Sequence, residues 1–353
     1  RNNIMIIAPF CDQGLGVQTK HYINTLTSHY NIHIFSFSPY YGYAIDRQKD
    51  PSEWAHESVY YTNHTREEIT DEEILDFVRQ KNIGKCIIPE TCWFRVFEIA
   101  QLLKRKNIKC YAIPNIEIIR SDEIYKHEYY HLVLANNWLC YNKLKEYGLS
   151  NIKYLGFSIP NDIKPKTPGN VIKFCCIGGM NAFTRKHVLE VCKAFSIAKQ
   201  QINNVLLIVT IQGNIDPRIE DYKNVKGITV IDTHLSHHDI MTIVKSSDIL
   251  IQVSSQEGLG LGFFEAISVG TPVLTLDTPP HNEIINKGNG WLIPCMKGSM
   301  NDNNKSIIDA SYFDENVLAE KIIEISHIPK SEFPHNFVDN FNSFKENFLN
   351  LLN

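Results

Sequence analysis

Two glutamates, Glu257 and Glu265, stand with seven residues between them in a stretch that also contains Gly258, Gly260 and Gly262. Carboxylates accept paired hydrogen bonds, so two of them suit a ligand that carries hydroxyl groups. Glycines let the backbone approach a ligand, and the start of a following helix offers amides to phosphates. The stretch therefore suits a ligand that carries both hydroxyls and phosphates.

The elements around these glutamates follow from the residues on either side. An apolar run from Ile249 to Val253 predicts a strand, and the residues after the glycines predict a helix. Gly270 suits a left-handed cap at the helix end, and Pro272 stands where a helix cannot continue. Glu257 is therefore expected in the loop beyond the strand and Glu265 early in the helix, at the edge where open α/β sheets bind ligands.

This arrangement resembles the retaining glycosyltransferases of the GT-B fold, particularly the large family 4 within glycosyl transferases group 1. The signature of that family is a glutamate, seven residues and a second glutamate. The resemblance is strong across about residues 170–295 and weaker before them. The segment from Asn282 to Pro294 is similar to the next helix and loop of the family. The best-matched residues keep the family's order and spacing at 248–253, 257–260, 265–266 and 270–273.

The resemblance implies a binding site for a nucleotide sugar. Glu265 would hold the ribose hydroxyls, and Glu257 would contact hydroxyls of the donor sugar. The alternative for the two acids is a capping acid and a surface acid around a tight loop. The donor-binding residues implied besides Glu265 are Gly14, Gly16, Gly258, Leu259, Gly260 and Leu261.

Negative charge develops on the diphosphate that leaves a nucleotide sugar, so fixed cations near it lower the barrier. The loop from Gly178 to His187 resembles the phosphate-contacting loop of the family. By that resemblance Lys186 is the diphosphate lysine, and Arg185 replaces the family's usual arginine, which is absent. A solvated pair at a helix start is the alternative. With Glu257, these two residues are the catalytic candidates, and the absence of any Asp-x-Asp motif favours a design without a metal.

A first glycine loop follows the strand-like run Ile4 to Ala8. Gly14 and Gly16 there match the family's loop for donor phosphates, although a simple tight turn is the alternative. The loop departs from a dinucleotide fingerprint because Thr19 holds the third glycine position. The second strand also ends without the acidic residue that would bind a ribose, so a dehydrogenase is disfavoured.

The acceptor side is less clearly marked. Many relatives place a histidine after the fifth strand, where this chain has Asn115 and Glu117. These two residues, together with Glu90 and Trp93 after the preceding strand, are the acceptor-side candidates. Each of them also fits a purely structural role.

A chain of 353 residues favours two domains. Short apolar runs alternate with helix-like segments, as expected for parallel sheets built from βαβ units. We therefore expect an α/β protein of the GT-B fold, with two Rossmann-like domains facing across a cleft. The predicted strands are Ile4–Ala8, Ile32–Phe37, Lys85–Ile88, Lys109–Ile113, His131–Ala135, Ile172–Ile177, Val205–Ile211, Ile228–Ile231, Ile249–Val253 and Pro272–Leu276.

The predicted boundaries follow from proline and glycine. Pro160, Pro165, Pro168 and Gly169 exclude a regular element, which places a linker at 161–169 between an acceptor-side domain at 1–160 and a nucleotide-sugar domain at 170–330. Residues 331–353 are expected to form an amphipathic helix that crosses back to the first domain. The apolar face of that helix would comprise Phe337, Phe341, Phe344, Phe348 and Leu352.

Composition limits the remaining possibilities. The net charge of -4 does not favour nucleic-acid binding. No apolar run approaches the length of a membrane span, so we expect a soluble, cytoplasmic chain with at most peripheral membrane association. A start at Arg1 rather than Met is compatible with a domain of a longer polypeptide. The nine cysteines lack CxxC spacing and are expected to be reduced core thiols, and His234, His237 and His238 to form a polar loop leading into a helix.

The resemblance implies a retaining hexosyltransferase that acts in glycan biosynthesis, and the absence of an Asp-x-Asp motif favours one that works without a metal. The donor would be a UDP- or GDP-linked sugar that serves as a co-substrate, with no cofactor, and the acceptor would be a hydroxyl of a glycan, lipid or protein. Alternatives are a GT-B protein that binds a nucleotide sugar or acts as a scaffold without turnover, and a glycoside hydrolase using the two glutamates.

Overall fold

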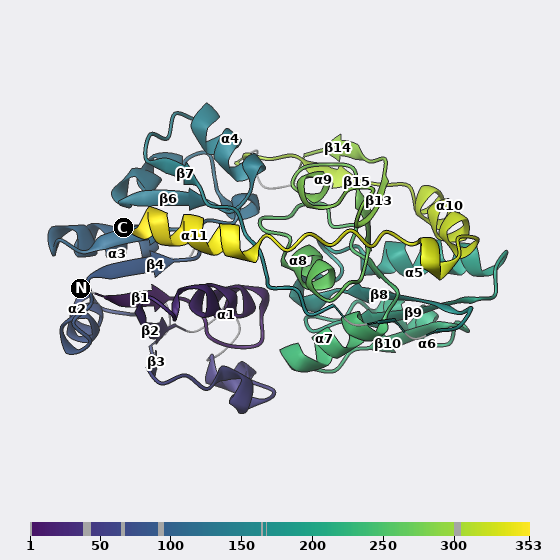
Figure 1. Ribbon diagram of the computed structural model, residues 1–353, viewed down its shortest axis with the longest axis horizontal. Coiled ribbons are helices and arrows are strands. Elements are labelled where there is room, and N and C mark those ends of the chain that lie inside the picture. The colour runs from purple at the N-terminus through teal and green to yellow at the C-terminus, as the bar shows by residue number, and fades with distance from the viewer. Residues whose placement is uncertain are drawn as a thin grey trace. The chain divides into compact units, whose positions relative to one another are not determined.

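The computed structural model describes residues 2–37, 44–64, 68–90, 95–163, 165–166, 168–299 and 305–353 (Figure 1). The chain divides into two compact units. Unit 1 comprises Arg1–Phe157, Asp302–Ile308 and Phe341–Asn353, and unit 2 comprises Ser158–Asn301 and Asp309–Asn340. The short segment Asp302–Ile308 therefore belongs to unit 1 although it lies within the sequence range of the predicted second domain.

Unit 1 is built on a seven-stranded parallel sheet with the order β3-β2-β1-β4-β5-β6-β7. Its strands are β1 (Asn3–Ile7), β2 (Asn31–Ser36), β3 (Val59–Tyr61), β4 (Lys85–Ile88), β5 (Lys109–Ala112), β6 (Leu132–Ala135) and β7 (Ile152–Tyr154). Its α-helices are α1 (Gly14–Leu26), α2 (Asp71–Gln80), α3 (Val96–Arg105), α4 (Trp138–Glu146) and α11 (Phe341–Leu352). Short 3-10 turns are η1 (Ile45–Arg47), η2 (Pro51–Trp54), η3 (Ile116–Ile118) and η4 (Ile124–Tyr129).

Unit 2 contains a six-stranded parallel sheet with the order β10-β9-β8-β11-β12-β13, and a separate antiparallel pair, β14 and β15. Its strands are β8 (Ile172–Ile177), β9 (Val205–Thr210), β10 (Ile228–Ile231), β11 (Ile249–Ile251), β12 (Val273–Leu276), β13 (Gly290–Ile293), β14 (Met296–Gly298) and β15 (Ala310–Tyr312). Its helices are α5 (Val188–Lys199), α6 (Glu220–Lys223), α7 (His237–Ser246), α8 (Leu261–Ser268), α9 (His281–Ile284) and α10 (Glu315–Ser326), with 3-10 turns η5 (Gly179–Asn181), η6 (Pro217–Ile219) and η7 (Lys330–Glu332).

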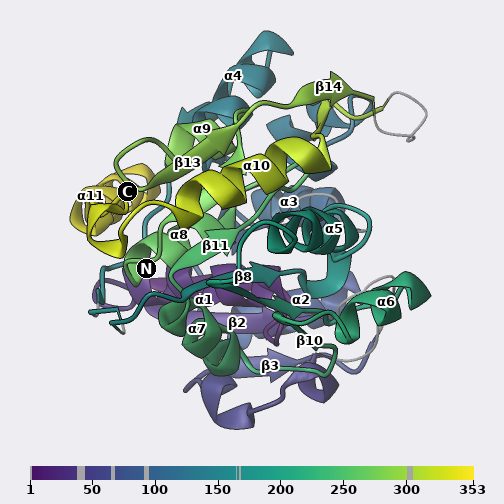
Figure 2. The ribbon, with the colours of Figure 1, turned by 90° about the vertical axis from the view of Figure 1, so that its right-hand side faces the viewer.

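The sheet of unit 2 is covered on both faces, which explains its long apolar runs. Successive strand residues point to opposite faces, so Phe174 and Cys176 of β8 pack in one apolar cluster and Cys175 packs in the other. Helices α5 and α10 cover the first face and lie side by side (Figure 2). Helices α7 and α8 supply Val244 and Phe263 to the second face.

Each of the ten predicted strands overlaps an observed strand, but the sequence missed five others. Strands β3 and β7 are three-residue edge strands in which some side chains are exposed or half-buried, so they lack a continuous apolar run. The segment from Asn282 to Pro294 was predicted as a helix and a loop. The helix is confirmed by α9, but the edge strand β13 lies where the loop was expected. The hairpin of β14 and β15 was the remaining omission.

The C-terminal helix begins later than predicted. Residues 331–340 lie outside any α-helix, so the expected start at 331 and the place of Phe337 on the helical face are both wrong. Helix α11 starts at Phe341 and buries Phe344, Phe348 and Leu352 within unit 1. The Phe348 ring lies 5.7 Å from that of Tyr22 in an edge-to-face arrangement, and Tyr111 donates its hydroxyl to the carbonyl of Leu352 at 3.1 Å.

The described cysteines agree with the expectation of core thiols. Seven of the eight in the described part of the chain are buried, Cys295 is half-buried, and none forms a disulfide within that part. In the part of the chain that the structure describes, no helix has both the length and the apolar character needed to cross a membrane.

Candidate active site

The loop between β11 and α8 takes its shape partly from internal packing. Gly260 is the residue before α8 and has a φ of 75°, the left-handed region that favours glycine. A Cβ atom on Gly262 would lie 2.3 Å from Oε1 of Gln252, and one on Gly260 would lie 2.6 Å from the Phe263 ring. The expectation that these glycines only clear space for a ligand is therefore incomplete, because the left-handed backbone at Gly260 also favours glycine and Gly262 leaves room for the Gln252 side chain.

Helix α8 ends as its sequence predicts. Gly270 has a φ of 75°, its amide donates to the carbonyl of Ile267 at 3.0 Å, and the amide of Thr271 donates to the carbonyl of Ala266 at 2.8 Å. This is the Schellman arrangement, in which a left-handed residue satisfies the last carbonyls of a helix. The helix that carries Glu265 is thus fixed at both ends by a left-handed glycine.

Glu257 is the centre of a buried ion-pair cluster at the carboxyl end of β11. Its side chain is 5% exposed. Lys186 donates from Nζ to Oε1 of Glu257, and Gln252 donates to the same oxygen at 2.8 Å. Nη1 of Arg185 lies 3.7 Å from Oε2. The sequence-predicted catalytic residues Glu257, Lys186 and Arg185 are therefore brought together by the fold.

The electrostatics of this cluster keep the carboxylate charged. Burial alone would raise the pKa of Glu257, but Lys186 and Arg185 outweigh it and hold that pKa well below the usual range. Burial lowers the pKa of Lys186, and the attraction of Glu257 opposes that shift. A buried charge is tolerated where an opposite charge and hydrogen bonds compensate for the lost water.

Backbone contacts position the two cations. The amides of Arg185 and Lys186 both donate to the carbonyl of Asn181, at 3.1 and 3.0 Å, so the segment after η5 folds back on itself. The amide of Ser255 donates to the carbonyl of Arg185 at 2.9 Å, which ties this segment to the loop that carries Glu257. The predicted alternative of a solvated pair at a helix start does not hold, since the Lys186 side chain is 16% exposed and α5 begins at Val188.

A buried histidine supports the same loop. Nε2 of His281 donates to the carbonyl of Ser254 at 3.0 Å, and the residue is fully buried at the start of α9. Burial lowers the pKa of His281 to about 4, although the nearby Glu257 acts in the opposite direction. The imidazole is therefore neutral near pH 7 and holds the loop as a hydrogen-bond donor.

Glu265 lies in the second turn of α8 and has a different partner. His237 donates from Nε2 to Oε1 of Glu265 at 2.6 Å, with side-chain exposures of 19% and 11%. The histidine segment was expected to be a polar loop leading into a helix, but His237 and His238 are the first two residues of α7 itself. Of the two acids of the signature, one is therefore held by fixed cations and the other by an imidazole.

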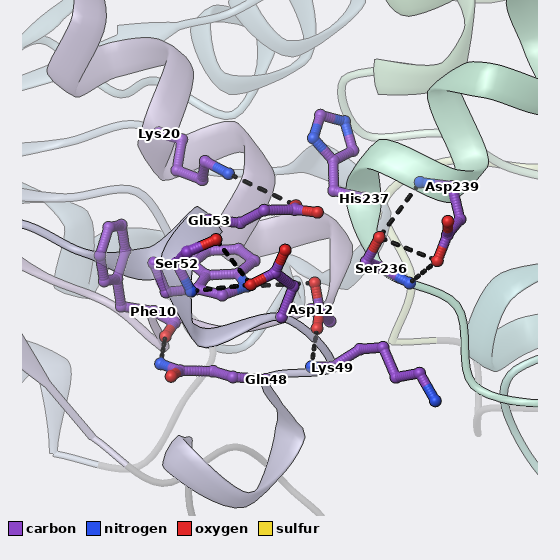
Figure 3. A network of polar contacts seen from close by, with 12 residues as sticks. Phe10, Asp12, Lys20, Gln48, Lys49, Ser52, Glu53, Ser236, His237 and Asp239 are labelled. Carbon is purple, nitrogen blue, oxygen red and sulfur yellow. Dashed lines mark hydrogen bonds and ion pairs between the residues drawn. The ribbon is translucent and has the colours of Figure 1, made fainter.

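The start of α7 is fixed by a capping box (Figure 3). Ser236 accepts a hydrogen bond from the amide of Asp239 at 3.1 Å, and Asp239 accepts one from the amide of Ser236 at 3.1 Å. Because both orphan donors are satisfied, the first turn is rigid where it presents His237.

The first glycine loop of unit 1 has two glycines with different roles. A Cβ atom on Gly16 would lie 2.1 Å from the carbonyl oxygen of Cys11, so packing of α1 requires a glycine there. Gly14 is exposed, and a Cβ atom there would meet nothing within 4 Å. Asp12 anchors the loop by accepting from the Trp54 indole at 3.1 Å and from the amide of Lys49 at 2.5 Å (Figure 3).

A buried network of amides lies at the carboxyl edge of the unit 1 sheet. The side-chain amide of Asn115 donates to Glu90 at 3.1 Å and to Gln18 at 3.2 Å, and it accepts from Asn136 at 3.0 Å. Glu90, Asn115 and Asn136 follow β4, β5 and β6, which are neighbours in the sheet. The structure therefore joins two of the acceptor-side candidates, places Glu117 half-buried in η3, and does not describe Trp93.

Three residues around the two glutamates of unit 2 were not predicted from the sequence. Gln252 and His281 support Glu257 and its loop, and His237 holds Glu265. Leu259 is buried and Leu261 opens α8, so both lie where the donor loop was expected. The available signal was positional, because Gln252 directly follows β11 and His237 directly follows the capping serine of a Ser-x-x-Asp motif.

Comparison with known proteins identifies the family and the fold. Residues 161–341, just over half of the chain, match the family model described as Glycosyl transferases group 1. The GtfA subunit of the UDP-N-acetylglucosamine–peptide N-acetylglucosaminyltransferase from Streptococcus agalactiae is 37% identical over 62 residues. That match covers 17% of this chain and 12% of the relative.

Solved structures show the same fold. The lipopolysaccharide outer core galactosyltransferase WaaB in its apo form has a TM-score of 0.65 at 14% identity, with 99% of each chain covered. The GtfA/B complex has a TM-score of 0.56 at 15% identity, with 80% of this chain and 60% of that chain covered. The predicted pair of Rossmann-like domains of the GT-B type is thus confirmed, and the chain belongs to the glycosyl transferases group 1 family.

Proposed function

We propose that the chain transfers a sugar from a UDP- or GDP-linked donor to a hydroxyl acceptor, with retention of anomeric configuration and without a metal. The observation that carries this proposal is the cluster of Glu257, Lys186 and Arg185 at the carboxyl edge of the unit 2 sheet. That edge is where open α/β sheets bind ligands. Membership of the family supports the reaction class.

The two cations suit the leaving group. In the proposed reaction the bond between the anomeric carbon and the diphosphate breaks, and the acceptor oxygen bonds to that carbon from the same face. The acceptor proton passes to the departing diphosphate. Lys186 and Arg185 would stabilise the negative charge that develops there, because they are held by the fold before the reaction begins.

The glutamates have separate tasks in this scheme. Glu257 would accept hydrogen bonds from hydroxyls of the donor sugar, and Glu265 would accept them from the ribose. The backbone from Gly258 to Leu261 would line the donor within unit 2. A glycosidase needs a general acid whose pKa is raised, whereas the cations lower the pKa of Glu257.

A thermal-shift screen with UDP-N-acetylglucosamine, UDP-glucose, UDP-galactose and GDP-mannose tests the donor class. A ligand that binds only the native state raises the unfolding temperature, so at least one donor should do so. Calorimetry with the nucleotide of that donor should then show weaker binding to Glu265→Ala. No shift with any donor would overturn the proposal, and unchanged affinity of Glu265→Ala would overturn the assignment of that residue.

Turnover tests the rest of the proposal. Nucleotide release from the donor should persist in excess EDTA, and NMR of the product should show the anomeric configuration of the donor. Inversion would contradict the proposed mechanism, and loss of activity in EDTA would contradict metal independence. Binding without any nucleotide release, with a panel of glycan, lipid and peptide acceptors, would identify a nucleotide-sugar-binding protein instead of an enzyme.

A further inference from the structure

The contact between His237 and Glu265 is not used by the chemistry proposed above. The two residues are 28 positions apart and come from two different helices, since His237 is the first residue of α7 and Glu265 lies in the second turn of α8. The hydrogen bond of 2.6 Å is made to one carboxylate oxygen. Because a carboxylate offers about four lone-pair sites, this bond leaves acceptor capacity on both oxygens. The imidazole can therefore orient the carboxylate and still leave its oxygens able to accept hydrogen bonds from a ligand.

The imidazole is itself held by the backbone. His237 directly follows Ser236, the cap of α7, and the capping box fixes the first turn of that helix (Figure 3). Helix α7 packs against α8, and Val244 and Phe263 from these helices share one apolar cluster. The packing of these two helices consequently fixes the backbone positions of His237 and Glu265 relative to each other.

We infer that His237 is a positioning residue for ribose recognition. It fixes the rotamer of Glu265 so that the carboxylate accepts both ribose hydroxyls together. A free glutamate side chain would have to be ordered when the ligand binds, which lowers affinity, and a pre-ordered one avoids that loss. The expected result is selection for ribonucleotides over 2′-deoxynucleotides, and this inference rests on the proposed role of Glu265.

Calorimetry on the full chain with UDP and 2′-deoxy-UDP tests this inference. GDP and 2′-deoxy-GDP replace them if the donor screen selects GDP. The wild type should bind the ribonucleotide about tenfold more tightly, as expected for a hydrogen bond to a charged group. In His237→Ala the preference should fall to about twofold, whereas His237→Gln, which retains a donor amide, should keep most of it.

His238→Ala is the matched control, because His238 is the exposed neighbour of His237 in the same helical turn. It should keep the ribose preference of the wild type. If His237 only ties two helices together, His237→Ala will lower the unfolding temperature and weaken both ligands equally, and an unchanged preference overturns the inference. A wild type that binds neither UDP nor GDP overturns the proposed function instead, and a wild type without any ribose preference overturns the role of Glu265.

Discussion

The carboxyl edges of the two sheets each hold a buried glutamate, but they compensate it differently. In unit 2, Glu257 as a whole residue is 4% exposed and pairs with Lys186 and Arg185. In unit 1, Glu90 is 6% exposed and accepts from Asn115, whose amide also contacts Gln18. Ion pairs stabilise the charged form of a group, whereas amide networks orient a group through the positions of their donors and acceptors. We therefore expect the edge of unit 2 to stabilise charge on a ligand and the edge of unit 1 to orient hydroxyl groups.

The largest expected effect comes from Lys186→Ala. Removing one partner of a buried ion pair should lower the free energy of unfolding by about 3–5 kcal/mol. Losing one fixed donor to the leaving diphosphate should reduce turnover by about 10²- to 10³-fold. Thermal unfolding and nucleotide release measure the two effects.

Lys193→Ala is the control for that variant, because Lys193 pairs with Glu315 at 3.2 Å while 57% exposed. Its loss should change stability by about 0–1 kcal/mol. Combining Lys186→Met with Glu257→Gln should recover much of the stability without recovering turnover. The buried carboxylate is then removed together with its lysine partner, and the remaining Arg185 side chain is 23% exposed. Equal small losses for Lys186→Ala and Lys193→Ala would show that the cluster is not an effective buried pair.

Asn115→Ala is the corresponding variant in unit 1, and its effects should be smaller. Removing this amide breaks hydrogen bonds to Glu90, Gln18 and Asn136 and should lower stability by about 1–3 kcal/mol. If this edge orients the acceptor, turnover should fall about tenfold or more while nucleotide affinity stays within about twofold.

Asn151→Ala is matched to it, because Asn151 donates to the carbonyls of His127 and Tyr130 in the same unit. It should affect stability alone. An Asn115→Ala variant that keeps normal turnover would contradict the prediction that this network orients the acceptor.

Acid should destabilise each unit through a deeply buried histidine, His127 in unit 1 and His281 in unit 2. Burial lowers the pKa of His127 and of His281 from 6.5 to about 4, so each binds a proton more weakly in the folded state. The contribution of each neutral imidazole to the free energy of unfolding is complete above about pH 6.5 and is lost as the pH falls towards 4. Between pH 7 and pH 5 the loss should be about 2 kcal/mol for each histidine. Thermal unfolding at these two pH values should show a smaller difference in His127→Gln and in His281→Gln than in the wild type. A full acid effect in both variants would exclude this origin, and His238→Gln serves as the exposed control.

The smallest effects separate two helix caps. Ser236 caps α7 in unit 2 and Thr70 caps α2 in unit 1, each by accepting from the third residue of its helix. Substituting either with Ala should lower stability by about 1 kcal/mol. Only Ser236→Ala should also weaken nucleotide binding, because α7 presents His237. Equal nucleotide affinity in the two variants would show that the cap has no influence on the site.

The sequence predicted the features that are local along the chain. Strand β8, the glycine loop and the helix carrying Glu265 each occupy a short continuous segment, so apolar runs and glycine spacing identified them. Lys186 required the family resemblance, since 71 residues separate it from Glu257. The partners contributed by packing were missed for the same reason: His237 reaches Glu265 from another helix, and Gln18 reaches Asn115 across 97 residues.

Predictions also failed where burial is incomplete. Strands β3 and β7 are edge strands whose side chains are not continuously buried, so no apolar run marks them. Residues 331–340 were assigned to the last helix because Phe337 continues the aromatic spacing of α11, but the helix starts at Phe341. Aromatic spacing indicated which residues pack, and it did not define where the helix begins.

The adjacent cysteines of β8 provide a way to follow the two layers of unit 2 separately. Cys175 and Cys176 are both buried, and they face different helical layers because they are consecutive in a strand. Burial raises the pKa of both thiols, so each reacts slowly until its own layer opens. Thiol-exchange rates compared between Cys175→Ala and Cys176→Ala would therefore time the opening of the α7–α8 layer against that of the α5–α10 layer.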